Sequence, residues 1–174
     1  MPSEDILSAL GGGDRRSTGR ADEVAALVAD EPRLFPKLMA GLWSTDPLIR
    51  MRAADAVEKV TRTRCELLRP YKKELLGLAA EASQQEVRWH LAAMLPRLAL
   101  TGCERQAAIF SLRSYLDDHS SIVKTFALQG LAELAEQEPR VQPEVVELLR
   151  QAERNGTPAM RARSRKLLKR FEQP

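Results

Sequence analysis

The feature that most constrains the fold of this chain is an internal repeat with a period near 37 residues. Four segments begin with a polar or turn residue and then place an aliphatic residue directly before a basic one. The segments are 46–60, 84–98, 120–134 and 157–171, and their pairs are Ile49-Arg50, Val87-Arg88, Val123-Lys124 and Met160-Arg161. The four aliphatic residues are 38, 36 and 37 positions apart. A period of this length is typical of a chain that stacks similar supersecondary units.

Each repeat is predicted to contain two helices. In the first two segments, apolar residues recur at i, i+4, i+7, i+8 and i+11, and the third has the same pattern with Gly130 at i+7; this spacing is one stripe of an α-helix. A second set of apolar anchors lies between the segments, at Met39, Leu76, Leu112 and Leu149, with steps of 37, 36 and 37. The sequence therefore predicts an all-α fold, a helical solenoid of about four helical-hairpin repeats.

We expect one domain over residues 1–174. It begins with an N-terminal cap, 1–33, in which residues 3–10 and 21–30 are helical and Gly11-Gly12-Gly13 separates them. The repeats then occupy about 34–69, 70–103, 104–140 and 141–174. Pro96 lies inside an apolar helical pattern, so we predict that its helix kinks or ends early.

The composition agrees with a folded helical chain. Hydrophobic residues make up 44% and charged residues 29%, which disfavours disorder, and 5% aromatic residues disfavours a β-rich core. No stretch approaches the roughly 18 apolar residues of a membrane helix, and the N-terminus lacks the basic region of a signal peptide. We therefore expect a soluble, cytoplasmic protein without a membrane partner, with the monomer favoured. A net charge of +3 permits an acidic partner.

The start of the second helix in each repeat resembles that of a HEAT repeat. Residues 46–54 read Asp-Pro-Leu-Ile-Arg-Met-Arg-Ala-Ala, which is a turn-aliphatic-basic-x-x-Ala-Ala pattern. Over nearly its whole length the chain is similar to small bacterial HEAT-like, armadillo-type proteins of unassigned function, with matching parts at 13–17, 50–56, 86–90 and 120–127. The resemblance implies a right-handed α-α superhelix and a non-catalytic interaction scaffold or adaptor. Tetratricopeptide repeats are the alternative, although their Trp, Gly and Tyr signature is missing.

Few residues suggest catalytic or metal chemistry. His90, His119, Cys65 and Cys103 are the only imidazole and thiol donors, and no pair of them has ligand spacing. We therefore predict no metal, no cofactor and no catalytic residue. For Cys103 and His119, a nucleophile pair is one interpretation, and a buried cysteine with a solvated turn histidine is the favoured one. A glycosylase-like or lyase-like enzyme is a remote alternative, for which no acid, base and nucleophile set can be assembled.

A basic and partly aromatic surface is the main candidate for partner binding. Arg50, Arg88, Lys124 and Arg161 recur once per repeat, so stacking would align them along one ridge, unless they pair with residues such as Asp46 and Asp118. One turn further along, near the start of the same helices, lie Arg52, Trp89, His90 and Phe126. The predicted partner-binding residues are Arg50, Arg52, Arg88, Trp89, His90, Lys124 and Phe126. The expected partner is an acidic or amphipathic protein segment.

Two further basic regions are candidate anion or nucleic-acid sites. Flexible glycines beside arginines expose backbone N–H groups, and residues 154–170 hold seven basic and no acidic side chains. The candidate residues are Gly13, Arg15, Arg16, Ser17, Arg161, Arg163, Arg165 and Lys166. The alternatives are a linker whose arginines pair with the solenoid, and a solvated helix face. The chain lacks the Walker lysine of a nucleotide-binding loop. Nucleic-acid binding is thus the second functional hypothesis.

Overall fold

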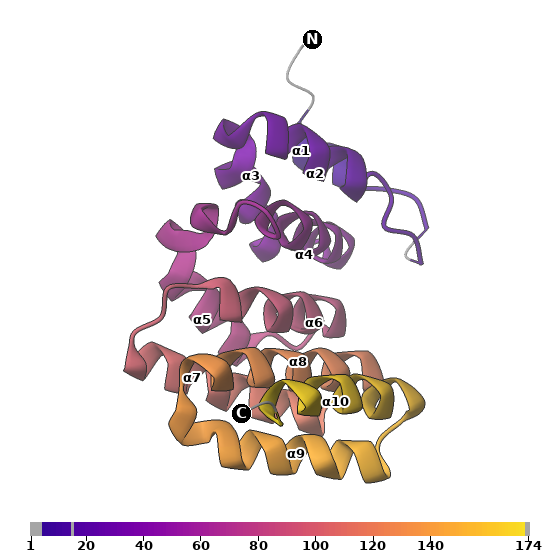
Figure 1. The fold of residues 1–174 in the computed structure, drawn as a ribbon. Helices are drawn as coiled ribbons and strands as arrows, with labels where there is room; N and C mark the ends of the chain where they lie inside the picture. Colours follow the sequence, from indigo (N-terminus) through magenta and orange to yellow (C-terminus); the bar gives the residue numbers. More distant parts are fainter. Residues whose placement is uncertain (1–4, 15, 173–174) are drawn as a thin grey trace. The chain divides into compact units, whose positions relative to one another are not determined.

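A computed structural model describes residues 5–14 and 16–172, which form helices and, within those ranges, no strand. The α-helices are α1 Ile6–Leu10, α2 Ala21–Asp30, α3 Phe35–Ala40, α4 Pro47–Thr61, α5 Lys72–Glu81, α6 Gln85–Met94, α7 Gly102–Ser114, α8 Ser121–Gln137, α9 Gln142–Asn155 and α10 Pro158–Phe171. Short 3-10 helices are Pro32–Leu34, Gly41–Trp43, Cys65–Tyr71, Leu95–Arg97, Tyr115–Asp117 and Pro139–Val141. The predicted all-α fold is confirmed (Figure 1).

The chain divides into two compact units, Met1–Lys72 and Lys73–Pro174. The N-terminal unit holds α1 to α4, and the C-terminal unit holds α5 to α10. A single four-repeat superhelix over 1–174 stays a prediction, as do the repeat boundaries.

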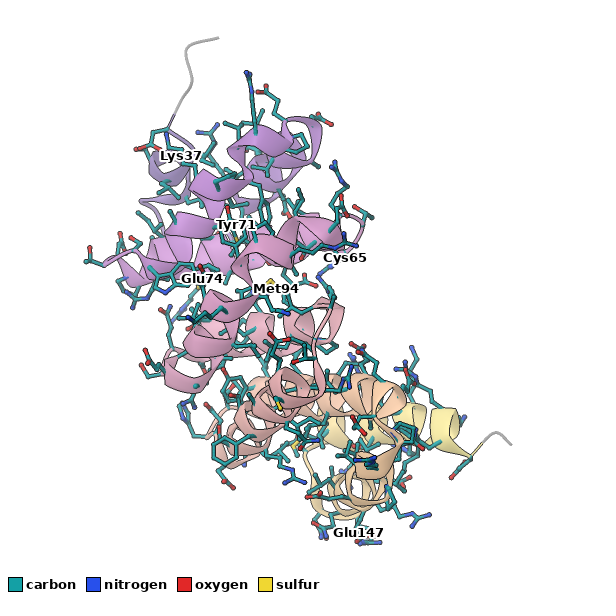
Figure 2. All side chains as sticks on the ribbon, turned by 90° about the vertical axis from the view of Figure 1, so that its left-hand side faces the viewer. Lys37, Cys65, Tyr71, Glu74, Met94 and Glu147 are labelled. Atoms are coloured by element: carbon teal, nitrogen blue, oxygen red, sulfur yellow. The ribbon has the colours of Figure 1, made fainter. Side chains whose placement is uncertain are left out.

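In the N-terminal unit, α4 is the helix against which the other elements pack. It contacts α1, α2 and α3 and the 3-10 turn Gly41–Trp43. Between α2 and α4, the ammonium group of Lys59 lies 2.5 Å from Asp22 Oδ1 and 2.6 Å from Asp55 Oδ2. The Phe35 and Tyr71 rings meet edge to face, with centroids 5.9 Å apart. Figure 2 labels Tyr71 on this unit.

In the C-terminal unit, α8 is the central helix. It packs against α6 and α10, and α7 and α9 contact it as well. Figure 1 shows α8 between α6 and α10. The predicted stripe of Val123, Ala127, Leu131 and Leu134 is fully buried. Of the predicted first-helix anchors, Met39, Leu112 and Leu149 are buried; Leu76 is only half-buried, because Leu75 and Ala79 take the inner positions of α5.

The second helices start at equivalent residues. Their N-caps are Asp46, Gln84, Ser120 and Thr157. The side chains of Asp46, Ser120 and Thr157 accept backbone hydrogen bonds from the first turn, which is the usual role of these residue types. The N-caps therefore define a common register for α4, α6, α8 and α10.

Pro96 ends α6 early, as predicted. The α-helix stops at Met94, residues Leu95–Arg97 form a 3-10 turn, and Leu98 is extended. Proline lacks the N–H that would continue the α-helical ladder, and its ring clashes with the preceding turn.

A glycine in α8 permits the close approach of α6. A Cβ atom built on Gly130 would lie 2.6 Å from the carbonyl oxygen of Ala92 and 2.9 Å from Leu112 Cδ1. The first atom belongs to a helix backbone, which cannot move aside without shifting α6. A side chain at this position is therefore excluded by the packing of α8.

We predict opposite effects for two glycine substitutions in the C-terminal unit. Gly130→Ala should lower the free energy of unfolding by about 1–3 kcal/mol, because the added methyl group overlaps the α6 backbone. Gly77→Ala should raise it by up to about 1 kcal/mol, because a Cβ there meets nothing within 4 Å and alanine favours the helix. Urea unfolding followed by circular dichroism measures both. Equal effects of the two variants would contradict the proposed close contact.

Candidate functional site

The once-per-repeat basic residues lie four positions after the N-caps, and two of them bind loop carbonyls. Arg50 Nη1 donates to the carbonyl oxygens of Ser44 and Thr45, at 2.7 and 3.1 Å. Arg88 Nε donates to the carbonyl oxygen of Ala82 at 2.7 Å. Both arginines thus hold the loop that precedes their own helix. Lys124 is half-buried and Arg161 is exposed.

Arg88 on α6 also pairs with a residue of the loop before α8. Its Nη1 lies 2.5 Å from Oδ2 of Asp118, whose side chain is 1% exposed, and its guanidinium lies 5.1 Å from the Tyr115 ring centroid. The Tyr115 hydroxyl donates to the carbonyl oxygen of Ala79 at 2.8 Å, and burial raises the pKa of Tyr115. The Asp118 pairing expected from the sequence is therefore present. Asp46 instead caps α4 by accepting from Leu48 N.

The pKa of Asp118 is held below its ordinary value. Burial alone would raise this pKa, but the hydrogen bond from the Ser120 backbone N–H and the ion pair with Arg88 outweigh burial. The carboxylate is therefore ionised and engaged near neutral pH. It fastens α6 to the loop before α8.

Arg52 does not lie on an exposed ridge, where the sequence placed it. The residue is 2% exposed. Its Nη1 donates to the carbonyl oxygens of Leu10 and Gly12 at 2.8 and 2.6 Å, and its Nη2 to that of Asp14 at 2.9 Å. Its Nε donates to the carbonyl oxygen of Ser17 at 3.2 Å. We call these four carbonyl groups the Arg52 cage.

Glycine conformation makes the Arg52 cage possible. Gly12, Gly13 and Gly19 have φ angles of 72°, 77° and 55°, in the left-handed region that favours glycine. A Cβ atom on Gly19 would lie 2.6 Å from Arg52 Cζ. The glycine-rich segment and Arg52 therefore form one structure. The sequence predicts the glycine-rich segment and Arg52 as separate sites, because they are about 40 residues apart in the chain and no local pattern joins them.

At Gly13 and Ser17, where the sequence predicts an anion site, backbone N–H groups of the segment take part in internal hydrogen bonds. The backbone N–H groups of Arg16, Ser17 and Gly19 donate to Asp14 Oδ1, the Asp14 carbonyl and Ser17 Oγ, at 2.9, 3.1 and 3.0 Å. The segment directs its carbonyls at Arg52 and uses these N–H groups internally, so they are not presented to an anion. Arg15 lies outside the described residues, and Arg16 is exposed.

Aromatic and cationic side chains form two contacts on the second helices of the C-terminal unit, one within α6 and one between α8 and α10. The Trp89 and His90 rings on α6 have centroids 5.5 Å apart. On α8 and α10, Arg163 Cζ lies 6.0 Å from the Phe126 ring centroid, and Arg163 Nη1 donates to Gln129 Oε1 at 2.8 Å. All four residues are half-buried. We call Trp89, His90, Phe126 and Arg163 the aromatic row.

The basic side chains of α10 separate into two groups. Arg163 and Arg170 bind α8, through Gln129 and through Glu136 at 2.6 Å. The exposed group is Arg161, Arg165, Lys166 and Lys169, which we call the cationic face. Three of its members line a groove of about 540 Å³ with Glu153, Ala162, Leu168 and Glu172. The candidate residues Arg161, Arg165 and Lys166 are thus accessible, whereas Arg163 belongs to the aromatic row.

An amphipathic groove of about 510 Å³ was not foreseen from the sequence. Its apolar lining is Leu116, Leu128, Leu148, Ala152 and Met160. Arg113 and Glu144, which form an ion pair, also line it. The lining comes from α7, α8, α9 and α10 and the turn after α7, so no sequence motif marks the groove.

One exposed aromatic side chain lies on α7. Phe110 is 75% exposed. The other first helices carry Lys37, Glu74 and Glu147 at the matching positions, with steps of 37, 36 and 37. Figure 2 labels these three charged residues, which are all exposed. Phe110 is therefore apolar at a position where the other first helices carry an exposed charged residue.

Metal and thiol chemistry finds little support in the part of the chain that the structure describes. No group of three or more His, Cys, Asp and Glu side chains there is arranged to hold a metal ion. Cys103 was expected to be buried and is exposed, as is Cys65 (Figure 2). The His119 side chain is 88% exposed, as expected. None of the described helices is long and apolar enough to span a bilayer.

The chain was compared with protein-family models, with curated proteins and with solved structures, and none of them matches it. The resemblance to HEAT-like proteins therefore rests on the residues themselves.

We predict that Arg52→Met releases the glycine-rich segment. The cage carbonyls lose their donor, so the free energy of unfolding should fall by about 2–4 kcal/mol. Trypsin should cleave after Arg16 faster than in the wild type, as measured by mass spectrometry over time. Arg33→Met is the control, because the Arg33 side chain is 82% exposed. Unchanged cleavage in Arg52→Met would show that the cage does not hold the segment.

We predict that Asp118→Asn destabilises the chain in a pH-dependent manner. At pH 7 the loss should be about 1–3 kcal/mol, because the ion pair with Arg88 is gone. Since the pKa of Asp118 is lowered in the folded state, its stabilisation is present above about pH 4 and is lost as the pH falls through the folded pKa. The difference between variant and wild type should therefore shrink at pH 3.

Urea unfolding at pH 7, 5 and 3 measures this difference. The control is Asp117→Asn, which removes an exposed carboxylate from the adjacent residue. A loss of the same size at pH 7 and pH 3 would rule out the ion pair as its cause.

Proposed function

We propose that this chain is a HEAT-like repeat protein without catalytic activity that binds a segment of another protein through the aromatic row. The observation that carries the proposal is the presence of Trp89, Phe126 and Arg163, all half-buried, on three helices that pack in sequence. Tryptophan and arginine contribute a large part of the binding energy in many protein interfaces. A half-buried aromatic ring is held in place and still offers a face to a partner.

The HEAT-like part of the proposal is supported by the regular helix pairs. The N-caps at Asp46, Gln84, Ser120 and Thr157 follow each other at 38, 36 and 37 residues. In the C-terminal unit, each second helix packs on the next one. We propose that the whole chain is a right-handed α-α superhelix of four such repeats with residues 1–33 as its N-terminal cap.

The charge near the aromatic row favours an acidic or amphipathic segment as partner. Lys124 and Arg161 lie two residues before Phe126 and Arg163 in the same helices. Because helices hold these side chains in register, binding costs little ordering entropy on the side of the protein. Polar and acidic residues of the partner would meet the cations, and apolar ones would meet Trp89 and Phe126.

Nucleic-acid binding is the second candidate, and the cationic face favours it. Arg161, Arg165, Lys166 and Lys169 are exposed over about two turns of α10. Phosphate contacts by such side chains give an affinity that falls steeply with salt. Glu153 and Glu172 line the same groove and reduce its positive charge. The aromatic row carries the primary proposal for this reason.

We predict that peptides selected on this protein bind the aromatic row. A displayed library of random 16-residue peptides, panned on the full chain, should yield acidic or amphipathic binders. Their affinity should fall at least about tenfold in Trp89→Ala and in Phe126→Ala, because each variant removes a contact of hot-spot type. Phe110→Ala is the matched control, since it removes an exposed aromatic side chain outside the row. Circular dichroism confirms that the variants fold.

Two results would contradict the proposal. In the first, the selected peptides bind both row variants as tightly as they bind the wild type. In the second, no peptide is selected, whereas DNA or RNA oligonucleotides bind at low salt. The double variant Arg165→Glu, Lys166→Glu then abolishes the binding of these oligonucleotides. The second result would establish the nucleic-acid alternative.

A further inference from the structure

Arg52 and three members of the aromatic row occupy the same position in their helices, counted from the N-cap. Arg52, His90, Phe126 and Arg163 each lie six residues after the N-cap of their helix. In the N-terminal unit this position is covered by residues 10–14 and 16–17 of the chain itself and is 2% exposed. In the C-terminal unit the same position is half-buried on α6, α8 and α10. The chain therefore contains one occupied example of the position that it repeats.

The occupied example shows what an arginine at this position binds. The four acceptors of Arg52 are main-chain carbonyl oxygens, from Leu10, Gly12, Asp14 and Ser17. A guanidinium has five N–H donors in one plane, so a peptide that curves around it can satisfy several of them at once. Positive φ angles at Gly12 and Gly13 provide that curvature. The hydrogen bonds to Arg52 depend on the path of the peptide backbone, and glycine can adopt the φ angles that this path requires.

Arg163 is the other arginine in this register. Its neighbours differ from those of Arg52, because an aromatic ring and a side-chain amide take the place of main-chain carbonyls. It is half-buried, and its guanidinium lies 6.0 Å from the Phe126 ring centroid. Within the described residues we see one hydrogen bond from its side chain, to Gln129 Oε1, against four from Arg52. Other N–H groups of Arg163 thus remain for a ligand, whereas the N–H groups of Arg52, at the equivalent position, already bind four carbonyl oxygens.

The surroundings of Arg163 suit neutral carbonyls better than a carboxylate. Gln129, which accepts from Arg163, itself donates to Glu133 on the next turn of α8. An anionic group on Arg163 would therefore approach a negative neighbour, whereas main-chain carbonyls carry no net charge. Trp89 on α6 and Phe126 on α8 are half-buried and offer aromatic surface against which a chain of small residues can pack.

We propose that the aromatic row binds a curved, glycine-rich peptide segment whose main-chain carbonyls accept hydrogen bonds from Arg163. The segment would lie on Arg163 as the carbonyls of Leu10, Gly12, Asp14 and Ser17 lie on Arg52. This inference rests on the proposed protein-binding function and adds the partner's chemistry: glycine where the chain curves, and small side chains at the guanidinium. A bulky residue there is excluded in the occupied example, since even a Cβ on Gly19 would lie 2.6 Å from Arg52 Cζ.

The test uses the chain's own segment as the probe. A fluorescein-labelled peptide of residues 5–20 is titrated with the full-length protein, and its anisotropy gives the dissociation constant. Arg163→Gln should weaken binding at least about tenfold, because several hydrogen bonds to the ligand disappear. Arg150→Gln is the matched control and should change binding less than about twofold, since Arg150 is an exposed α9 arginine outside the aromatic row and the cationic face.

A second probe separates backbone recognition from side-chain recognition. In this peptide the carbonyl groups of Gly12 and Asp14 are replaced by methylene groups, and all side chains are kept. We expect at least about a tenfold loss of affinity for the wild type, and no further loss in Arg163→Gln. A peptide that keeps both carbonyls but has Leu10 changed to Ala should bind within about threefold of the parent.

The outcomes distinguish the two proposals. Absence of binding of the 5–20 peptide up to about 1 mM, or equal binding by wild type and Arg163→Gln, overturns the backbone-recognition proposal. If library-selected peptides then still lose affinity in Trp89→Ala, the proposed protein-binding function stands without it. If neither Trp89→Ala nor Arg163→Gln affects any peptide, both proposals fail.

Discussion

Each second helix buries one apolar stripe against its neighbours, and this constraint orients every other side chain of the helix. In the C-terminal unit the stripe of α8 packs between α6 and α10, with Gly130 allowing the α6 backbone to come close. Because the N-caps start these helices at equivalent residues, the side chains four and six positions later point in equivalent directions. The surfaces that we propose for partner binding follow from that geometry, since packing of the stripe leaves these positions at the edge of the core.

The residues at those positions then diverge according to what lies next to them. At the fourth position Arg50 and Arg88 turn back to loop carbonyls, and Arg88 also joins Asp118. At the sixth position Arg52 is covered by the glycine-rich segment, whereas Phe126 and Arg163 are half-buried. A buried guanidinium is tolerated at Arg52 because four carbonyl oxygens replace the water it loses. A repeated sequence position thus serves as a clamp in one unit and as a candidate binding surface in the other.

This difference bears on how the protein would recognise the partner that we propose. A clamp on main-chain carbonyls selects a backbone path, and an aromatic row selects apolar or planar groups. Under that proposal the surface would accept a curved, small-residue peptide, with the exposed cations of α10 available to acidic residues beside it. Recognition of this kind tolerates variation in the partner's side chains, because the hydrogen bonds involve its backbone.

The sequence by itself determined the helices, their pairing by chain order and most of the core. Apolar spacing, N-cap residues and prolines are local signals, and they located α4, α8 and α10 and the early end of α6 at Pro96. It also identified Trp89, Phe126 and the cationic face of α10 as candidates. Only the tertiary structure decided that Arg52 is buried, that four carbonyl groups of the glycine-rich segment bind it, and that Arg163 lies beside Phe126 and apart from the cationic face. The physical reason is that an arginine looks alike in any sequence, and its role depends on which carbonyls and rings long-range packing brings within a hydrogen bond of it.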